Sequence, residues 1–366
     1  MRDQSLDLLK GIACLLMILA HTHLQIDLPS KILTFLGGFT PILFFAVSGI
    51  TANFQARKYP VTGIVTAYAM IFLLGLSFAS MIVGNFWVAF DMDILQIIAV
   101  GVLLLFLIQR FLDPSPWFYL AATVAVFALK LLTDALPRDT WWMHYLVNIV
   151  LEPGNFVAIP WLFPFFLGMF CYLIPNRYNT WLAGAAILAM GSVWGLGLPL
   201  GIDNRWDMTL GYFLFSILLT SMSFYVARQL PQTFVANNLT LLTWLGKNSL
   251  LFLYVHIGVI WLIRNYTQGI WGTYWVWPAV CAASLALMAV LPGLLSALRV
   301  PQLMVRFPAW IVLLVLILAA PLTLPAGTPL VLAQLIFGVV FSLYYASMTR
   351  FLKGIAWPAS RKIQAD

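Results

Sequence analysis

The feature that most constrains this chain is a succession of apolar runs, each about twenty residues long, with short joints between them. A helix of that length spans the hydrocarbon core of a bilayer. Hydrophobic residues make up 63% of the chain and charged residues 8%, proportions that exclude a soluble globular domain. Prolines and glycines mark the joints between the runs. The sequence therefore predicts an all-α, polytopic bundle of membrane helices.

We expect about twelve spans, within a range of roughly ten to twelve. No long polar stretch offers a second folding unit, so residues 1–366 are expected to form a single transmembrane domain. The expected spans are 6–25, 35–54, 62–83, 92–111, 116–133, 156–174, 180–198, 208–227, 246–264, 273–295, 308–323 and 329–349.

The basic residues indicate which way the bundle faces. With both termini in the cytoplasm, fourteen of the nineteen lysines and arginines fall on the inner side and four on the outer side, while one lies within a span. This asymmetry follows the positive-inside rule. The net charge of +7 is thus explained by topology and by attraction to anionic lipid, without a nucleic-acid partner. The four outer residues are Lys31, Arg138, Arg205 and Arg264.

The first expected span carries ionisable residues on one face. Lys10 and His21 are eleven positions apart, which places their side chains within about 20° of one direction and about 16 Å apart along a helix axis. Asp7 precedes Lys10 by about one turn. Ionisable groups are costly inside a membrane, so they are functional candidates. A neutral imidazole near pH 7 makes His21 a candidate general base, and a helix-packing hydrogen bond is the alternative.

Other polar residues have two interpretations each. Lys10, with help from Arg57 and Lys58, could bind an anionic ligand from the cytoplasm, or all three could serve topology alone. Asp91 and Asp93 could cap the fourth span, or one carboxylate could orient His21 or bind an outer substrate.

His256 lies near mid-membrane, where an unsatisfied imidazole is expensive. It either hydrogen-bonds a neighbouring helix or lines a cavity.

Several short segments, in this order along the chain, together resemble the transmembrane acyltransferase superfamily. That superfamily includes acyltransferase family 3 and the bacterial relatives of heparan-alpha-glucosaminide N-acetyltransferase. Lys10 and His21 resemble its Arg-x10-His hallmark, with lysine in place of the usual arginine. Residues 44–49, FFAVSG, are similar to its phenylalanine-rich stretch; segments 93–96, 159–169 and 245–256 resemble other parts of the heparan-type branch. With Asp7 and Asp91, the candidate substrate or cavity residues are Ser48, Gln96, Trp161, Asn248, Ser249 and His256.

The resemblance implies a membrane-bound acyltransferase. Acetyl-CoA or another acyl-CoA would bind from the cytoplasm, and its acyl group would pass to a hydroxyl or amine of an extracytoplasmic acceptor, expected to be a glycan. His21, with Asp93 as the second catalytic candidate, would act as base or carry the acyl group, and Lys10, Arg57 and Lys58 would hold the donor. No metal is expected, and a bacterial inner membrane is the expected location.

Two other classes of function are consistent with the sequence. A proton-coupled secondary transporter could have twelve spans and a relay through Asp7, Lys10 and His21. The two halves of the chain show no matching hydropathy, which counts against it. A non-catalytic membrane scaffold would make both His21 and His256 dispensable.

Overall fold

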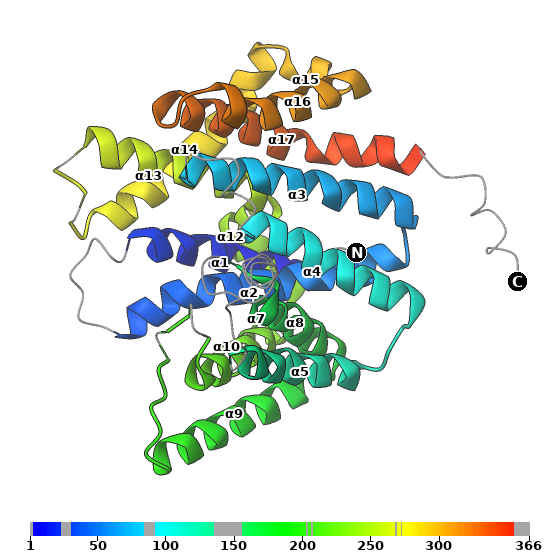
Figure 1. The fold of residues 1–366 in the computed structure, drawn as a ribbon, viewed down its shortest axis with the longest axis vertical. Helices are drawn as coiled ribbons and strands as arrows, with labels where there is room; N and C mark the ends of the chain where they lie inside the picture. Colours follow the sequence, from blue (N-terminus) through cyan, green and yellow to red (C-terminus); the bar gives the residue numbers. More distant parts are fainter. Residues whose placement is uncertain are drawn as a thin grey trace, which may run out of the picture.

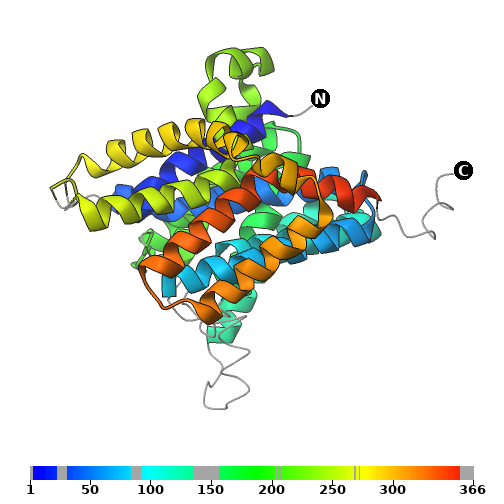
Figure 2. The same cartoon turned by 90° about the horizontal axis from the view of Figure 1, so that it is seen from above.

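The computed structural model describes residues 3–22, 31–83, 92–134, 156–202, 204–205, 208–267, 269–271 and 273–354. Within these ranges the regular elements are helices and none is a strand, which confirms the all-α prediction. The longer helices run side by side in a layered bundle, seen from two directions in Figures 1 and 2.

The helices have the following bounds. Those before residue 200 are α1 (Gln4–Thr22), α2 (Lys31–Ala56), α3 (Val61–Val83), α4 (Ile94–Phe111), α5 (Pro116–Asp134), α7 (Ala158–Trp161), α8 (Phe163–Leu173) and α9 (Arg177–Gly195). Those after it are α10 (Leu210–Gln229), α11 (Gln232–Asn238), α12 (Thr240–Lys247), α13 (Ser249–Tyr266), α14 (Val276–Ala297), α15 (Val300–Met304), α16 (Phe307–Thr323) and α17 (Thr328–Gly354).

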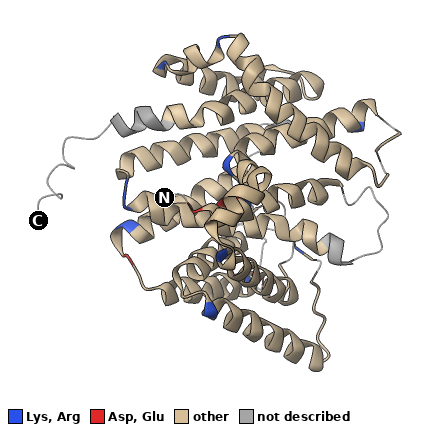
Figure 3. Cartoon of the chain, turned by 180° about the vertical axis from the view of Figure 1, so that it is seen from behind, with Lys and Arg blue, Asp and Glu red and all other residues tan. Residues whose placement is uncertain are grey.

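Length and composition suit most of these helices to a bilayer. Within the described residues, nine helices are long and apolar enough to cross a membrane, and two further stretches, Ala158–Leu173 and Phe307–Thr323, are shorter apolar helices. In Figure 3, Lys, Arg, Asp and Glu are sparse, and most lie toward the ends of helices and in the connections. The count of twelve and the cytoplasmic position of both termini stay predictions.

Two of the expected spans are broken, which corrects the sequence prediction. The span expected at 156–174 is kinked at Ile159, whose backbone leaves helical geometry, and α7 and α8 meet at Leu162. Pro164 stands in the first turn of α8, where its missing N–H costs nothing. The span expected at 246–264 breaks at Asn248, whose backbone leaves helical geometry. The Asn248 side-chain amide donates to the carbonyl oxygen of Trp244 at 2.8 Å, which satisfies an end of α12.

Helix α1 lies near the centre of the bundle, against α2 and α12 (Figure 1). The close approach of α1 and α12 depends on two glycines. A Cβ on Gly11 would collide with the carbonyl of Leu242, and a Cβ on Gly246 would collide with the carbonyl of Asp7. Small residues let membrane helices approach until their backbones touch. This contact holds the face of α1 that carries Lys10 in a fixed position.

Helix α2 packs on α4 and α8 in the same way. A Cβ on Gly49 would lie 2.9 Å from the carbonyl oxygen of Phe165, and a Cβ on Gly168 would collide with the backbone of Ala46. In the Ser-Gly pair that ends residues 44–49, Gly49 thus allows close helix packing, while Ser48 is buried and lines a cavity.

The last two helices cover α3. Both α16 and α17 pack against it, and Ser77 of α3 donates a hydrogen bond to the side chain of Gln334 on α17. The Gln334 amide in turn donates to the carbonyl oxygen of Ile317 on α16 at 3.0 Å. A buried side-chain amide with both ends bonded fixes α17 against its neighbours.

Candidate active site

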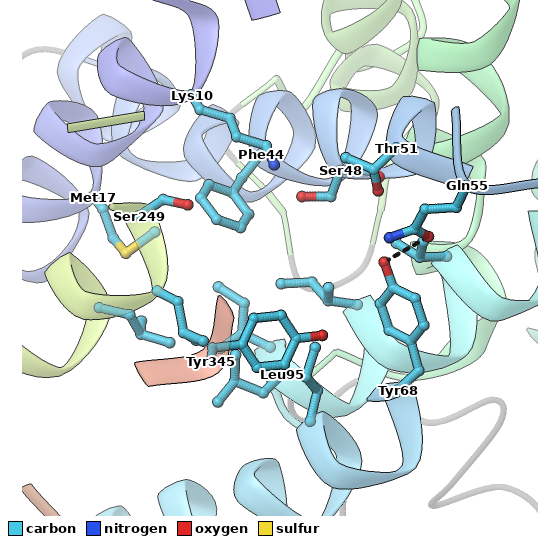
Figure 4. A pocket seen from close by; sticks show the side chains of 16 residues that line it. Lys10, Met17, Phe44, Ser48, Thr51, Gln55, Tyr68, Leu95, Ser249 and Tyr345 are labelled. Carbon is cyan, nitrogen blue, oxygen red and sulfur yellow. Dashed lines mark hydrogen bonds between the residues drawn. The ribbon is translucent and has the colours of Figure 1, made fainter. Parts of the chain in front are cut away.

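A cavity of about 250 Å³ lies among α1, α2, α3, α4, α13 and α17 (Figure 4). Part of its wall is aliphatic, with Met17 and Leu95 among the contributors, and part is polar. An apolar pocket with a few polar groups is the usual form of a small-molecule site. The polar lining residues are Lys10, Ser48, Thr51, Gln55, Tyr68, Ser249 and Tyr345.

Lys10 is the only charged residue among the described residues that line this cavity. Its Nζ lies 6.0 Å from the centre of the Phe44 ring, within the range of a cation–π attraction. Figure 4 shows the lysine side chain reaching along the cavity from α1, with the Tyr345 hydroxyl on the opposite wall. A half-buried ammonium beside an aromatic face and several hydroxyls attracts an anion.

The polar wall extends toward the turn that joins α2 and α3. The Tyr68 hydroxyl donates to Oε1 of Gln55 at 3.1 Å, and Gln55 is the last residue but one of α2. Arg57 and Lys58 follow in the turn, exposed and outside the lining. Arg57 and Lys58 therefore follow a lining residue closely in the sequence, but their side chains do not line the cavity.

His21 lies outside the lining of this cavity. On α1 the lining includes Lys10 and Met17, and the exposed His21 follows Met17 by one turn. The expected face of α1 is continuous, since α1 is one helix from Gln4 to Thr22. The cavity, however, ends at Met17, so the passage expected to run from Lys10 to His21 is only partly open. Met17 lies between the two on this face of α1.

The imidazole of His21 has a second imidazole beside it. The ring centroids of His21 and His256 are 5.5 Å apart, and their planes are tilted by 36°. His256 is fully buried on α13, and its Nδ1 lies 2.7 Å from the carbonyl oxygen of Phe252 on the same helix. In the structure, Nδ1 of His256 bonds its own helix, and His256 is not among the residues that line this cavity.

Asp93 and Gln96 hold the start of α4. The Asp93 carboxylate accepts from the N–H of Ile94 at 2.6 Å, and Gln96 closes a capping box by accepting from the N–H of Asp93. Both side chains are buried, with Asp93 at 8% exposure. These contacts are those of a helix cap. Asp91 lies outside the described residues.

Three further candidates have packing roles. Trp161 is buried between Phe45 and Phe156, with edge-on rings at 5.9 and 4.8 Å. Asp7 is buried where α1 meets α12. Asn248 caps α12, as described above, whereas its neighbour Ser249 does line the cavity.

Sequence reasoning missed four polar residues of the cavity. Thr51 and Gln55 follow Ser48 by three and seven positions, the spacing of a single helix face, so that signal was available. Tyr68 and Tyr345 carry no comparable signal. Tyr345 is brought to the site by the packing of α17, more than three hundred residues after Lys10.

No group of three His, Cys, Asp or Glu side chains in the described part of the chain could hold a metal ion.

The family model for the acyltransferase domain of acyltransferase family 3 matches residues 3–292 of the sequence. This match covers α1 to most of α14 and leaves α15, α16 and α17 outside it. No curated protein and no solved structure shows a significant match. The match extends over well more than half of the chain, so this protein belongs to acyltransferase family 3 and is a membrane acyltransferase.

Proposed function

We propose that the protein transfers a short acyl group, expected to be acetyl, from cytoplasmic acyl-CoA to a hydroxyl or amine of an extracytoplasmic glycan, in a bacterial inner membrane. The observation that carries the proposal is the amphipathic cavity with Lys10 in its wall, on the same helix as His21. Lys10, His21 and the cavity all fall within the region matched by the acyltransferase domain, except for Tyr345.

The shape of the cavity suits a slender donor. A volume of about 250 Å³ is below the range of roughly 300–1,000 Å³ typical of drug-sized ligands. It can take the pantetheine arm of CoA but leaves no room for the nucleotide. The nucleotide would remain outside, near Arg57 and Lys58, and Lys10 would attract a phosphate at the mouth of the arm. The hydroxyls of Ser48 and Ser249 would bond the amides of the arm.

The chemistry requires a base beyond the cavity. The acceptor's oxygen or nitrogen attacks the thioester carbon, its C–S bond breaks, and the acceptor's proton goes through His21 to the leaving thiolate. Alternatively, His21 attacks first and carries the acyl group. In both routes the thioester must pass Met17, whose three rotatable bonds allow the side chain to move aside. His21 is itself exposed, so an acceptor from outside could reach it.

The test uses membranes that contain the full-length protein, with radiolabelled acetyl-CoA and cell-envelope glycans as acceptors. Wild-type membranes should transfer label to a glycan, and His21→Ala should lower kcat by about 100- to 10,000-fold, the usual contribution of a general base. Since the ring of His21 is exposed, this variant should fold. Full activity in His21→Ala would refute its role, and transfer from a donor other than acyl-CoA would refute the donor.

The family match favours an enzyme over the transporter and the scaffold considered from the sequence. Thermal stabilisation by acetyl-CoA would separate them further, because a ligand that binds the native state raises its melting temperature. A transporter with no acyl-CoA site predicts no such shift.

A further inference from the structure

The buried partner of His21 has an unused nitrogen. Nδ1 of His256 lies 2.7 Å from the carbonyl oxygen of Phe252. A carbonyl can only accept, so Nδ1 carries the proton and donates it. The other nitrogen, Nε2, is then an unprotonated acceptor. It is buried and has no hydrogen-bond partner among the described residues.

The ring of His256 has little freedom to turn away. Phe252, one turn earlier on α13, stacks on its face with centroids 4.9 Å apart and planes tilted by 11°. Together with the bond from Nδ1 to the Phe252 carbonyl, this stack fixes both the orientation and the tautomer. The position of Nε2 is therefore set by α13 alone.

The spacing between the two histidines suits an edge-to-edge bond. An N–H···N bond of about 3 Å that joins two imidazoles edge to edge separates their centroids by about 5 Å. The observed separation of 5.5 Å is close to that value, and the planes are tilted by 36° rather than parallel as in a stack. The bond requires that the His21 ring turns one of its nitrogens toward Nε2 of His256.

We propose that His256 is a positioning residue for acyl transfer: its Nε2 accepts a hydrogen bond from one ring nitrogen of His21 and so leaves the other nitrogen of His21 as the base. This inference rests on the proposed function and adds a residue to it. An orphaned buried acceptor costs free energy, and the bond to His21 removes that cost. His256 takes no proton during turnover. The acceptor's proton moves to the second nitrogen of His21 and then to the thiolate.

Two substitutions separate this role from a structural one. The amide of asparagine can occupy the place of Nδ1, and the amide of glutamine can occupy the place of Nε2. His256→Asn therefore keeps a donor for the Phe252 carbonyl and loses the acceptor for His21. His256→Gln keeps an acceptor for His21 and loses the donor. A purely structural histidine would be better replaced by asparagine.

The experiment measures kcat and the KM for acetyl-CoA of both variants, with wild type and His21→Ala in parallel. We expect His256→Gln to keep kcat within about tenfold of wild type and His256→Asn to lose about 100-fold, with KM unchanged in both. A kcat for His256→Asn equal to or above that of His256→Gln would overturn the proposal. If His21→Ala were fully active, the proposed function of His21 would fail instead, so the two failures are distinguishable.

A measurement on the wild-type protein covers the case in which a variant does not fold. The chain has four histidines, His21, His23, His144 and His256, so ¹⁵N-histidine labelling gives few signals. We expect a nitrogen–nitrogen coupling across one N–H···N bond that disappears in His21→Ala. An ¹⁵N spectrum in which His256 is protonated on Nε2, or shows no such coupling, would also overturn the proposal.

Discussion

Removal of the charge at Lys10 gives the sharpest test of the donor site. Lys10→Met keeps the length and most of the apolar stem of the side chain, so the shape of the cavity should change little, while the charge and its attraction to the Phe44 ring are removed. An ammonium and a phosphate charge about 5 Å apart attract by about 3 kcal/mol at an effective dielectric constant of about 20. Lys10 is only half-buried, and screening by solvent lowers this to about 1–2 kcal/mol.

That loss corresponds to a rise of about 5- to 30-fold in the KM for acetyl-CoA. The kcat should stay near wild type, since Lys10 lies about 16 Å from His21 along α1. Initial rates in purified, detergent-solubilised protein at low ionic strength give both constants. Lys10→Arg keeps the charge and should keep KM within about threefold, while Lys247→Met removes an exposed lysine outside the cavity and should have no effect on KM.

An unchanged KM in Lys10→Met would show that the phosphates bind elsewhere, and Arg57→Met and Lys58→Met would be the next variants. A lower kcat at constant KM would also contradict the reasoning. It would mean that Lys10 acts on the transition state rather than on donor binding.

Two more predictions concern packing and capping. Gly11→Ala places a methyl group against the carbonyl of Leu242 and should destabilise the protein by about 1–3 kcal/mol. The control is Gly191→Ala on α9, where no atom lies within 4 Å of the new Cβ. Equal melting temperatures of the two variants in detergent would contradict the packing argument. Asp93→Asn keeps the cap of α4 and should keep stability and activity, whereas Asp93→Ala should lose about 1 kcal/mol. A folded but inactive Asp93→Asn would show instead that the carboxylate takes part in the reaction.

Hydropathy was sufficient to predict the helices but could not predict their breaks. The length of an apolar run reflects the thickness of the bilayer, and α1, α3 and α4 begin and end within a few residues of the expected spans. The kink at Ile159 directly precedes a proline, Pro160, which disfavours helical geometry in the residue before it. The break at Asn248 has a side-chain cap. Both act over one turn of helix, too short a distance to alter the average hydropathy of a span.

The candidate site was partly predictable for a different reason. Lys10 and His21 share one helix face, so the spacing in the sequence was enough to relate them. The pairing of His21 with His256, and the contribution of Tyr345 to the cavity, depend on how α13 and α17 pack against the rest of the bundle. Helix spacing carries no information across helices that are far apart in the chain, so neither contact could be derived from the sequence.

The site therefore consists of a binding part at Lys10 and a reacting part at His21, with Met17 between them, and this division has a measurable consequence. Changes at residues more than about 7–10 Å apart with no shared contacts add in free energy within about 0.5 kcal/mol. Lys10→Met and His21→Gln should thus lower kcat/KM by amounts that add in the double variant. The losses in kcat/KM from His21→Gln and His256→Asn should not add, because His256 acts only through His21. Once His21 is replaced, the further change at His256 should lower kcat/KM no more. Coupling between Lys10 and His21, or independence of His21 and His256, would show that the two parts have been divided in the wrong place.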